Sequence, residues 1–400
     1  MTFSEFFHMI VTRTKELWLR IVLMGGIQLI NLVLAYLILP EEYGKIALAA
    51  FVIKNCHQAV LGLSQGYIYT NFNLKENYLG TYAPAYLILG LLYIVGTSVF
   101  LNMPLALAGI ALVIIFLAEP YMRVRREFSV ILIPEFLFLV AILTATAAKR
   151  LDTAIPEPAL TFFLCTLFTA IFVLRFWKRS LKGLLKDVST IQFSWNNLIK
   201  LIRSGSQAYF STLLAFFVLV IDRAYITGMY GQTVLGTYML AFQLCLAITL
   251  LSSLFNATAV VDFGELMQGE RKKMLTHLRH RYNLSLFVNF ALWVLVTGLL
   301  FFFAGPLFPE FEGLLVITAI LGLGIAAQAA FNAVSPFLFH LEKQFVTNVI
   351  AVGILIVKVV AYHVFFAAGV SPVAAITIQS ILLLIGASSS TFYLYRVVGQ

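Results

Sequence analysis

Long apolar runs separated by short polar connections dominate the pattern of the 400-residue chain. A helix needs about 20 consecutive apolar residues to cross the hydrocarbon core of a bilayer, and runs of that length recur along the whole sequence. The pattern predicts an all-α polytopic membrane protein. About twelve transmembrane helices are expected, over residues 17–39, 44–70, 78–101, 103–121, 129–148, 158–177, 205–228, 233–261, 283–307, 313–339, 344–368 and 371–395.

Composition supports this prediction and excludes a soluble protein with a very large core. Hydrophobic residues make up 61% of the chain and charged residues 11%, with a mean hydropathy of +0.95. Soluble domains are about 45–50% apolar and about 25% charged. The three cysteines, Cys56, Cys165 and Cys245, all fall in apolar runs, which argues against a disulfide framework or a C-x-x-C metal site.

The positive charges are distributed unequally between the two sides of the predicted membrane. Of the 27 lysines and arginines, 21 fall on the side that holds both termini and 3 on the other. The remaining three, Lys54, Arg223 and Lys358, lie within spans. The positive-inside rule therefore predicts that both termini are cytoplasmic. The formal charge of +9 reflects this topology and contact with anionic lipids, so no nucleic-acid partner is expected.

Polar segments divide the chain into two halves. Residues 1–16 carry apolar side chains at helical spacing, which predicts an interfacial amphipathic lead-in. An N-terminal six-helix bundle is expected over 17–177 and a C-terminal six-helix bundle over 205–400. Between them, residues 178–204 form the longest polar stretch, a basic cytoplasmic linker.

A short sequence repeat marks the first turn of each half. "LPEEYGKIALA" leads into the second span and "YGQTVLGTYMLA" into the eighth. At a constant offset of 192 residues, three positions match: Gly44, Leu48 and Ala49 with Gly236, Leu240 and Ala241. Six spans per half is an even number, so both halves enter the membrane from the same side. That is a parallel repeat, for which a substrate site is expected between the halves.

Two adjacent charges interrupt the apolar run "LAFFVLVIDRAYITGMYG". Asp222 and Arg223 project about 100° apart on a helix, so they do not pair with each other and each needs its own partner or water. Each charge costs about 2.5–3.5 kcal/mol at the centre of a membrane helix. Two hypotheses remain open: the charges lock the bundle through interhelical salt bridges, or Arg223 contacts an anionic substrate while Asp222 orients it or titrates.

Other polar side chains within the spans are further candidates for lining a cavity. A polar stripe at positions i, i+3 and i+4 is formed by Lys54, His57 and Gln58. Exposing these side chains to lipid would cost free energy, so we expect the stripe to face the interior. Polar packing between helices explains such a stripe equally well. The remaining candidates are Gln28 and Asn31, Gln328 and Asn332, Lys358 beside Tyr362, and the isolated acid Glu135, which together with Asp222 is a candidate for ion coupling.

Motifs that carry chemistry are missing from the sequence. It contains no metal-ligand cluster, glycine-rich phosphate loop or nucleophile elbow. We therefore expect no enzymatic activity, no metal and no cofactor.

Three stretches resemble a known family of transporters. "LILPEEYGKIAL", "EPYMRVRREFSVILIPEFL" and "VIDRAYITGMYGQTVLGTYMLAFQL" are similar to Wzx-type O-antigen and polysaccharide flippases of the multidrug/oligosaccharidyl-lipid/polysaccharide exporter superfamily. The resemblance implies two six-helix bundles around a central cavity in the bacterial inner membrane. It implies alternating access that carries an undecaprenyl-pyrophosphate-linked oligosaccharide, an O-antigen or exopolysaccharide repeat unit, to the outer leaflet. Membrane lipids and H⁺ or Na⁺ as coupling ion are the other expected partners.

Two other functions remain open. The first is a drug or cation exporter of the same superfamily, which a cavity rich in acids would favour. Here Lys54, Arg223 and Lys358 outnumber Asp222 and Glu135 within the spans, which suits an anionic cargo better. The second is a membrane-embedded sugar polymerase or glycosyltransferase. It is disfavoured because the loops on the far side are too short to build a catalytic site.

The predicted topology can be tested by thiol labelling. A cysteine introduced at Glu310 should react with an impermeant thiol reagent added to intact spheroplasts, because this loop is predicted to face outwards. A cysteine introduced at Lys182 should react only after lysis. The reverse pattern would overturn both the orientation and the direction of transport.

Overall fold

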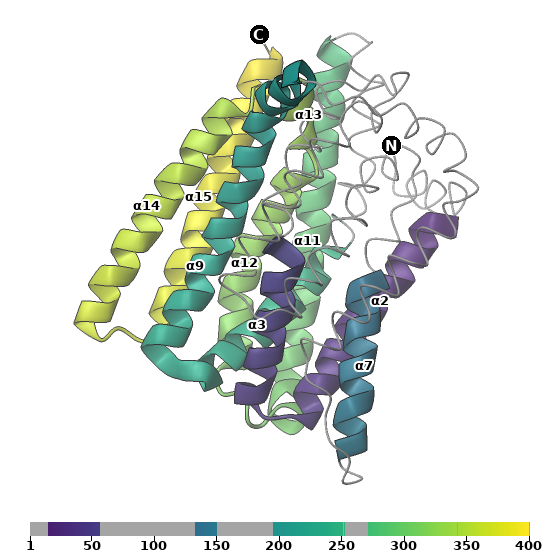
Figure 1. Cartoon of the computed structure of the whole chain (residues 1–400), viewed down its shortest axis with the longest axis vertical. Helices are drawn as coiled ribbons and strands as arrows, with labels where there is room; N and C mark the ends of the chain where they lie inside the picture. Colours follow the sequence, from purple (N-terminus) through teal and green to yellow (C-terminus); the bar gives the residue numbers. More distant parts are fainter. Residues whose placement is uncertain are drawn as a thin grey trace. The chain divides into compact units, whose positions relative to one another are not determined.

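The computed structural model describes residues 15–56, 133–149, 195–250, 252, 271–341 and 343–399, in which every regular element is helical and no strand occurs (Figure 1). Contacts divide the chain into two compact units. Unit 1 comprises Met1–Ile30 and Asn73–Lys200, and unit 2 comprises Asn31–Phe72 and Leu201–Gln400.

The described part of unit 1 contains most of helix α2 (Lys15–Leu37) and helix α7 (Ile133–Lys149). The two helices meet at a glycine. A Cβ atom at Gly26 would lie 2.8 Å from the ring of Phe136, which is closer than real Cβ atoms approach. Gly26 therefore lets the aromatic side chain of α7 lie against the backbone of α2.

Unit 2 contains the sites discussed below. Its helices are α3 (Pro40–Cys56), α9 (Trp195–Ile248, from Leu201 onwards), α11 (Arg271–Leu307), α12 (Leu314–Asn332), α13 (Pro336–His340), α14 (Phe345–Ala368) and α15 (Pro372–Gly399). Helix α12 is the inner helix, packed against α11 and α15. It contains Gly322 and Gly324, where a Cβ atom would meet Trp293 and the backbone of Ser380 respectively, so small residues allow this close packing.

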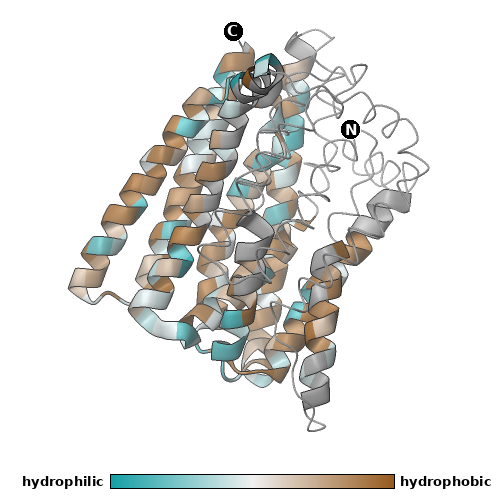
Figure 2. Cartoon of the chain, in the orientation of Figure 1, coloured by the Kyte–Doolittle hydropathy of each residue, from teal (hydrophilic) through white to brown (hydrophobic). Residues whose placement is uncertain are grey.

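Length, hydropathy and burial identify a multi-pass membrane protein. Among the described residues, five helical segments are long and apolar enough to cross a bilayer. In the apolar windows of α11 and α14 only 11% of residues are buried, against 67% for α12. The outward faces of α11 and α14 carry apolar side chains such as Phe287, Phe301 and Val364, and α14 is apolar along most of its length (Figure 2). These faces suit lipid contact.

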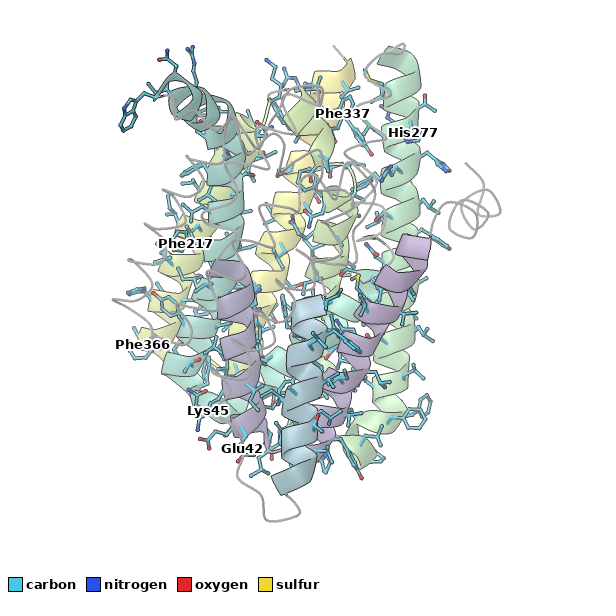
Figure 3. All side chains as sticks on the ribbon, turned by 45° about the vertical axis from the view of Figure 1, so that its right-hand side comes forward. Glu42, Lys45, Phe217, His277, Phe337 and Phe366 are labelled. Atoms are coloured by element: carbon cyan, nitrogen blue, oxygen red, sulfur yellow. The ribbon has the colours of Figure 1, made fainter. Side chains whose placement is uncertain are left out.

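The two ends of unit 2 carry segments that the sequence predicts on opposite sides of the membrane. Figure 3 shows Glu42 and Lys45 at one end, and His277 and Phe337 towards the other. This arrangement agrees with the predicted alternation of loops. Which end faces the cytoplasm stays a prediction.

Several predicted spans match helices of the structure. Spans 344–368 and 371–395 correspond to α14 and α15, and span 283–307 corresponds to α11, which begins earlier, at Arg271. Span 313–339 is divided into α12 and α13 before Pro336, which cannot donate a helical hydrogen bond. Helix α9 already begins at Trp195, inside the predicted linker 178–204.

Other parts of the predicted architecture lie outside the described residues. These are the spans 78–101, 103–121 and 158–177, most of the lead-in 1–16, and the linker up to residue 194. The number of helices and the division into bundles over 17–177 and 205–400 therefore stay predictions. In the described part, α3 packs with the helices of the C-terminal half.

A sharp turn at one glycine separates two predicted spans, 205–228 and 233–261. The backbone of Gly231 has φ 83° and ψ −178°, a conformation essentially restricted to glycine. We call residues 201–230 of α9 its first arm and residues 232–248 its second arm. The chain reverses between them, which brings residues of both arms against α3 (Figure 1).

The two glycines matched by the sequence repeat touch in space. A Cβ atom at Gly44 of α3 would lie 3.0 Å from the backbone nitrogen of Gly236 in the second arm of α9. One at Gly236 would overlap the carbonyl group of Pro40 at the start of α3. The backbones of α3 and the second arm are therefore in direct contact, which only glycine permits at these positions.

A methyl group at Gly236 should destabilise this crossing. We expect Gly236→Ala to lower the free energy of unfolding by about 1–3 kcal/mol, the usual range for overpacking. Gly228→Ala is the matched control, because no atom lies within 4 Å of its Cβ position and alanine favours helix. Melting temperatures of the purified proteins measure both effects. Equal melting temperatures for the two variants would contradict the close crossing.

Candidate functional site

A buried ion pair joins the first arm of α9 to α14. Asp222 is 0% exposed and Lys358 is 1% exposed. Lys358 Nζ lies 2.5 Å from Asp222 Oδ1, and the hydroxyl of Tyr362 donates a 2.6 Å hydrogen bond to the same oxygen. We call Asp222, Lys358 and Tyr362 the Asp222 cluster.

Helical spacing explains how this cluster forms. Lys358 and Tyr362 are four residues apart and lie on one face of α14. Lys358 also donates a 2.7 Å hydrogen bond to the carbonyl of Val218, one turn before Asp222. The ammonium thus meets a carboxylate and a carbonyl of the same helix. Among the described residues, Asp222 Oδ2 has no hydrogen-bond partner.

The free-energy cost of burying either charge is low only while the other charge is present. A lone charge in a membrane helix is costly, and neither lipid nor water compensates it inside the unit. The pair neutralises both charges and adds hydrogen bonds, which is the condition under which a buried ion pair is tolerated. The cluster therefore fixes α14 against the first arm of α9.

Arg223 points to a different set of neighbours. It is 1% exposed, and its guanidinium carbon lies 3.5 Å from the ring centroid of Phe51 in α3. The corresponding distances are 4.5 Å to Phe242 and 5.8 Å to Tyr238, both in the second arm of α9. Desolvated cation–π contacts are worth about 2 kcal/mol or more. Arg223 thereby connects both arms of α9 with α3.

Further polar contacts extend from this region. Tyr238 donates a hydrogen bond of 3.3 Å to Gln379 Oε1 in α15. Along α14, the Tyr225 hydroxyl lies 2.5 Å from His363 Nδ1. Near the end of the first arm, Tyr230 donates to the carbonyl of Val370 at 2.7 Å. Charged and polar side chains of α9 are thus matched by partners on three neighbouring helices.

A cavity of about 260 Å³ lies next to the Asp222 cluster, between α9, α12, α14 and α15. Val218, which accepts the hydrogen bond from Lys358, lines it. Gln328 and Asn332 also line it, and Gln328 Nε2 donates to Asn332 Oδ1 at 3.0 Å. Gln328 and Asn332, both predicted from the sequence to line a cavity, therefore lie side by side on one wall of this one.

The structure brings only some of the predicted residues together. Asn31 is buried and accepts a 3.4 Å hydrogen bond from the Tyr43 hydroxyl, while Gln28 is half-buried on the part of α2 in unit 1. Lys54 lies on α3 and Glu135 on α7, but their side chains are outside the described set, and so are His57 and Gln58 entirely. The roles assigned to all of these residues stay predictions.

Sequence reasoning missed the aromatic rings around Arg223 and several polar residues of the cavity. Phe51, Tyr238 and Phe242 give no signal, because aromatic residues are common throughout these apolar helices. Gln344 lines the cavity, but it lies in the polar connection before α14. A glutamine is ordinary in such a connection, so nothing in the sequence pointed to its role. Ser390, another lining residue, ends a run of three serines in the last span that could have been noticed.

Metal ligands form no cluster in the part of the chain that the structure describes. No group of three or more His, Cys, Asp or Glu side chains there could hold a metal ion.

Comparison with known proteins identifies the fold. No protein-family model and no curated protein matches the sequence. Solved structures do match. The lipid II flippase MurJ in an inward closed conformation has a TM-score of 0.64 at 12% identity, covering 93% of this chain and 86% of MurJ.

Transporters of the MATE type match over similar lengths. A variant of VcmN from Vibrio cholerae has a TM-score of 0.61 at 12% identity, covering 98% of this chain and 97% of VcmN. ClbM, solved in complex with Rb⁺, has a TM-score of 0.61 at 14% identity, covering 98% of this chain and 94% of ClbM. The chain has the fold of these membrane transporters. Identities this low show the fold alone.

The dependence of Asp222 and Lys358 on each other can be measured. Asp222→Asn and Lys358→Met should each cost about 3–5 kcal/mol, because each leaves an uncompensated buried charge. The double variant should lose less than the sum of the single losses, because both charges are gone. Thermal unfolding of the purified proteins tests this prediction. Additive losses would show that the two charges are not coupled.

An exposed pair on α3 provides the matched control. Lys45 Nζ lies 2.6 Å from Glu41 Oε1, with both side chains more than half exposed. An exposed pair of this kind is worth about 0.3–0.5 kcal/mol. Glu41→Gln and Lys45→Met should therefore leave the melting temperature nearly unchanged.

Proposed function

We propose that this protein is a flippase that carries an undecaprenyl-pyrophosphate-linked oligosaccharide, an O-antigen or exopolysaccharide repeat unit, across the bacterial inner membrane. Both termini are cytoplasmic, and transport proceeds by alternating access. The shared fold supports a transporter, and the lipid II flippase MurJ is one of the proteins that share it. The similarity of three stretches to Wzx-type flippases supports the choice of a lipid-linked sugar.

The balance of buried charge is the observation that carries the proposal. Among the described residues, the buried charged side chains are Asp222, Arg223, Arg281 and Lys358. Three of these four are cationic, and Lys358 pairs with the single acid. Because most of the buried charges in this part of the chain are cationic, they suit an anionic cargo such as a pyrophosphate better than a cationic drug.

Each candidate residue has a role in this mechanism. Arg223 leaves its aromatic neighbours to contact the pyrophosphate in the conformation that binds the lipid. The cavity candidates Lys54, His57, Gln58, Gln28 and Asn31 supply further contacts, as do Gln328, Asn332 and Lys358. Asp222 is the coupling residue, because a proton or Na⁺ on its carboxylate competes with Lys358 for the same oxygen. Glu135 is the second coupling candidate.

A drug or cation exporter is the alternative that the same fold permits. VcmN and ClbM are MATE transporters, and ClbM was solved with Rb⁺ bound. The two functions differ in the charge of the cargo rather than in the architecture. An experiment on the cargo therefore separates them.

Deletion of the gene in its own bacterium tests the proposed function. A flippase predicts loss of the surface glycan and accumulation of its lipid-linked precursor, both reversed by a plasmid copy. Mass spectrometry of extracted lipids measures the precursor. An unchanged glycan together with greater sensitivity to cationic drugs would establish the exporter instead.

Substitutions at Arg223 test the proposed contact with pyrophosphate. Arg223→Ala should reduce surface glycan at least tenfold at normal protein abundance, and Arg223→Lys should keep part of the activity because the charge remains. Arg203→Ala removes a positive charge from an exposed position of the same helix and should export normally. Loss of the Arg223→Ala protein itself would instead favour a purely structural role for the guanidinium.

A further inference from the structure

Every described residue that lines the cavity beside the Asp222 cluster belongs to unit 2. The volume of the cavity is about 260 Å³, and one of its lining residues, Asn332, is exposed, so it is an open pocket. At about 30 Å³ per water, it could hold roughly eight or nine waters, or one ring of hexose size. The space between these helices is therefore large enough for a ligand.

The described lining of the cavity combines apolar side chains, which make up most of its surface, with polar but uncharged ones. Seven side chains supply hydroxyl and amide groups: Ser211, Gln328, Asn332, Ser335, Gln344, Thr347 and Ser390. They come from α9, α12, α14, α15 and the connections before α13 and α14, so they surround the space rather than lie on one side. Purely apolar cavities stay empty, whereas polar groups inside a membrane protein require partners.

One amide of the cavity has no hydrogen-bond partner among the described residues. Gln344 is 3% exposed, and its backbone carbonyl is occupied by Thr347 and by the Asn348 amide. Its side-chain Nε2, however, makes no hydrogen bond to any residue that the structure describes. Burying an amide donor without a partner costs about 1–3 kcal/mol. A ligand that accepts a hydrogen bond here would remove that cost.

Lys358 is not among the residues that line the cavity. Its ammonium binds the Val218 carbonyl and Asp222. No lysine, arginine, aspartate or glutamate lines the cavity among the described residues. The site therefore does not suit a phosphate or a cation. It suits a neutral group that both donates and accepts several hydrogen bonds, and Phe331 and Ile354 supply apolar surface.

We propose that this cavity is a subsite for one neutral sugar ring of the transported oligosaccharide. The inference rests on the proposed function. It separates recognition of the sugar, inside unit 2, from recognition of the pyrophosphate by cationic side chains. Hydroxyl groups of the ring accept from Gln344 Nε2 and exchange hydrogen bonds with the surrounding serine, threonine and amide side chains.

Saturation-transfer NMR on the purified full-length protein in nanodiscs tests the subsite directly. The probes are free glucose, N-acetylglucosamine and methyl mannoside, each at tens of millimolar. Ala351 lines the cavity, so Ala351→Phe should fill it and reduce saturation transfer to the bound probe more than tenfold. Val349→Phe adds the same ring to the same helix at a position that is 53% exposed, and it should bind like the wild type.

A second variant tests the subsite independently, in case Ala351→Phe does not fold. Gln344→Met keeps the size of the side chain and removes its donors, so it should weaken binding severalfold at an unchanged melting temperature. If no probe binds to the wild type, or if Ala351→Phe binds as well as Val349→Phe, the cavity holds water only and the proposal fails. Displacement of a bound sugar by inorganic pyrophosphate would also overturn it, since that result identifies an anion site.

Export assays separate this inference from the proposed function. If a wild-type plasmid restores surface glycan to the deletion strain while Ala351→Phe does not, at equal abundance, both proposals are supported. If both plasmids restore it and no sugar binds in the NMR assay, only the subsite is wrong. If the deletion strain never loses its glycan, the proposed function is wrong, whatever the NMR result.

Discussion

A carboxylate within the apolar core of a membrane helix must be neutralised by the protein, because the surrounding lipid offers neither charge nor water. Asp222 meets this condition through Lys358 and Tyr362, which lie one turn apart on α14. The requirement is geometrical as well as electrostatic, since the ammonium also binds the carbonyl of Val218. The position of α14 against α9, and hence the cavity between these helices, depends on this cluster.

The adjacent arginine shows why two neighbouring charges need not interact. Successive helical residues point about 100° apart, so Asp222 faces α14 while Arg223 faces Phe51 and Phe242. A single dipeptide thus connects the first arm of α9 with three other helical segments. The rings of Phe51 and Phe242 cover the guanidinium. That arrangement is compatible with both a structural role and a later contact with an anion.

Much of the fold could be predicted from hydropathy, because a membrane span needs a long apolar run. Helix α14 was predicted to within one residue at each end and α15 to within four, and the turn at Gly231 falls between two predicted spans. Sequence spacing also put Lys358 and Tyr362 on one face. It could not give their partner, because pairing between helices distant in sequence depends on three-dimensional packing. For the same reason, nothing in the sequence marked Gln344 as part of a cavity or Phe51 as a neighbour of Arg223.

The crossing of α3 with the second arm of α9 brings Gly44 against Gly236, the two positions that the repeat matches. In a dimer of identical chains, a residue on the twofold axis touches its own counterpart in the other copy. This crossing joins the two matched positions of the repeat within one chain. A substitution can therefore change one side of the crossing and leave the other, which a dimer of identical chains does not allow.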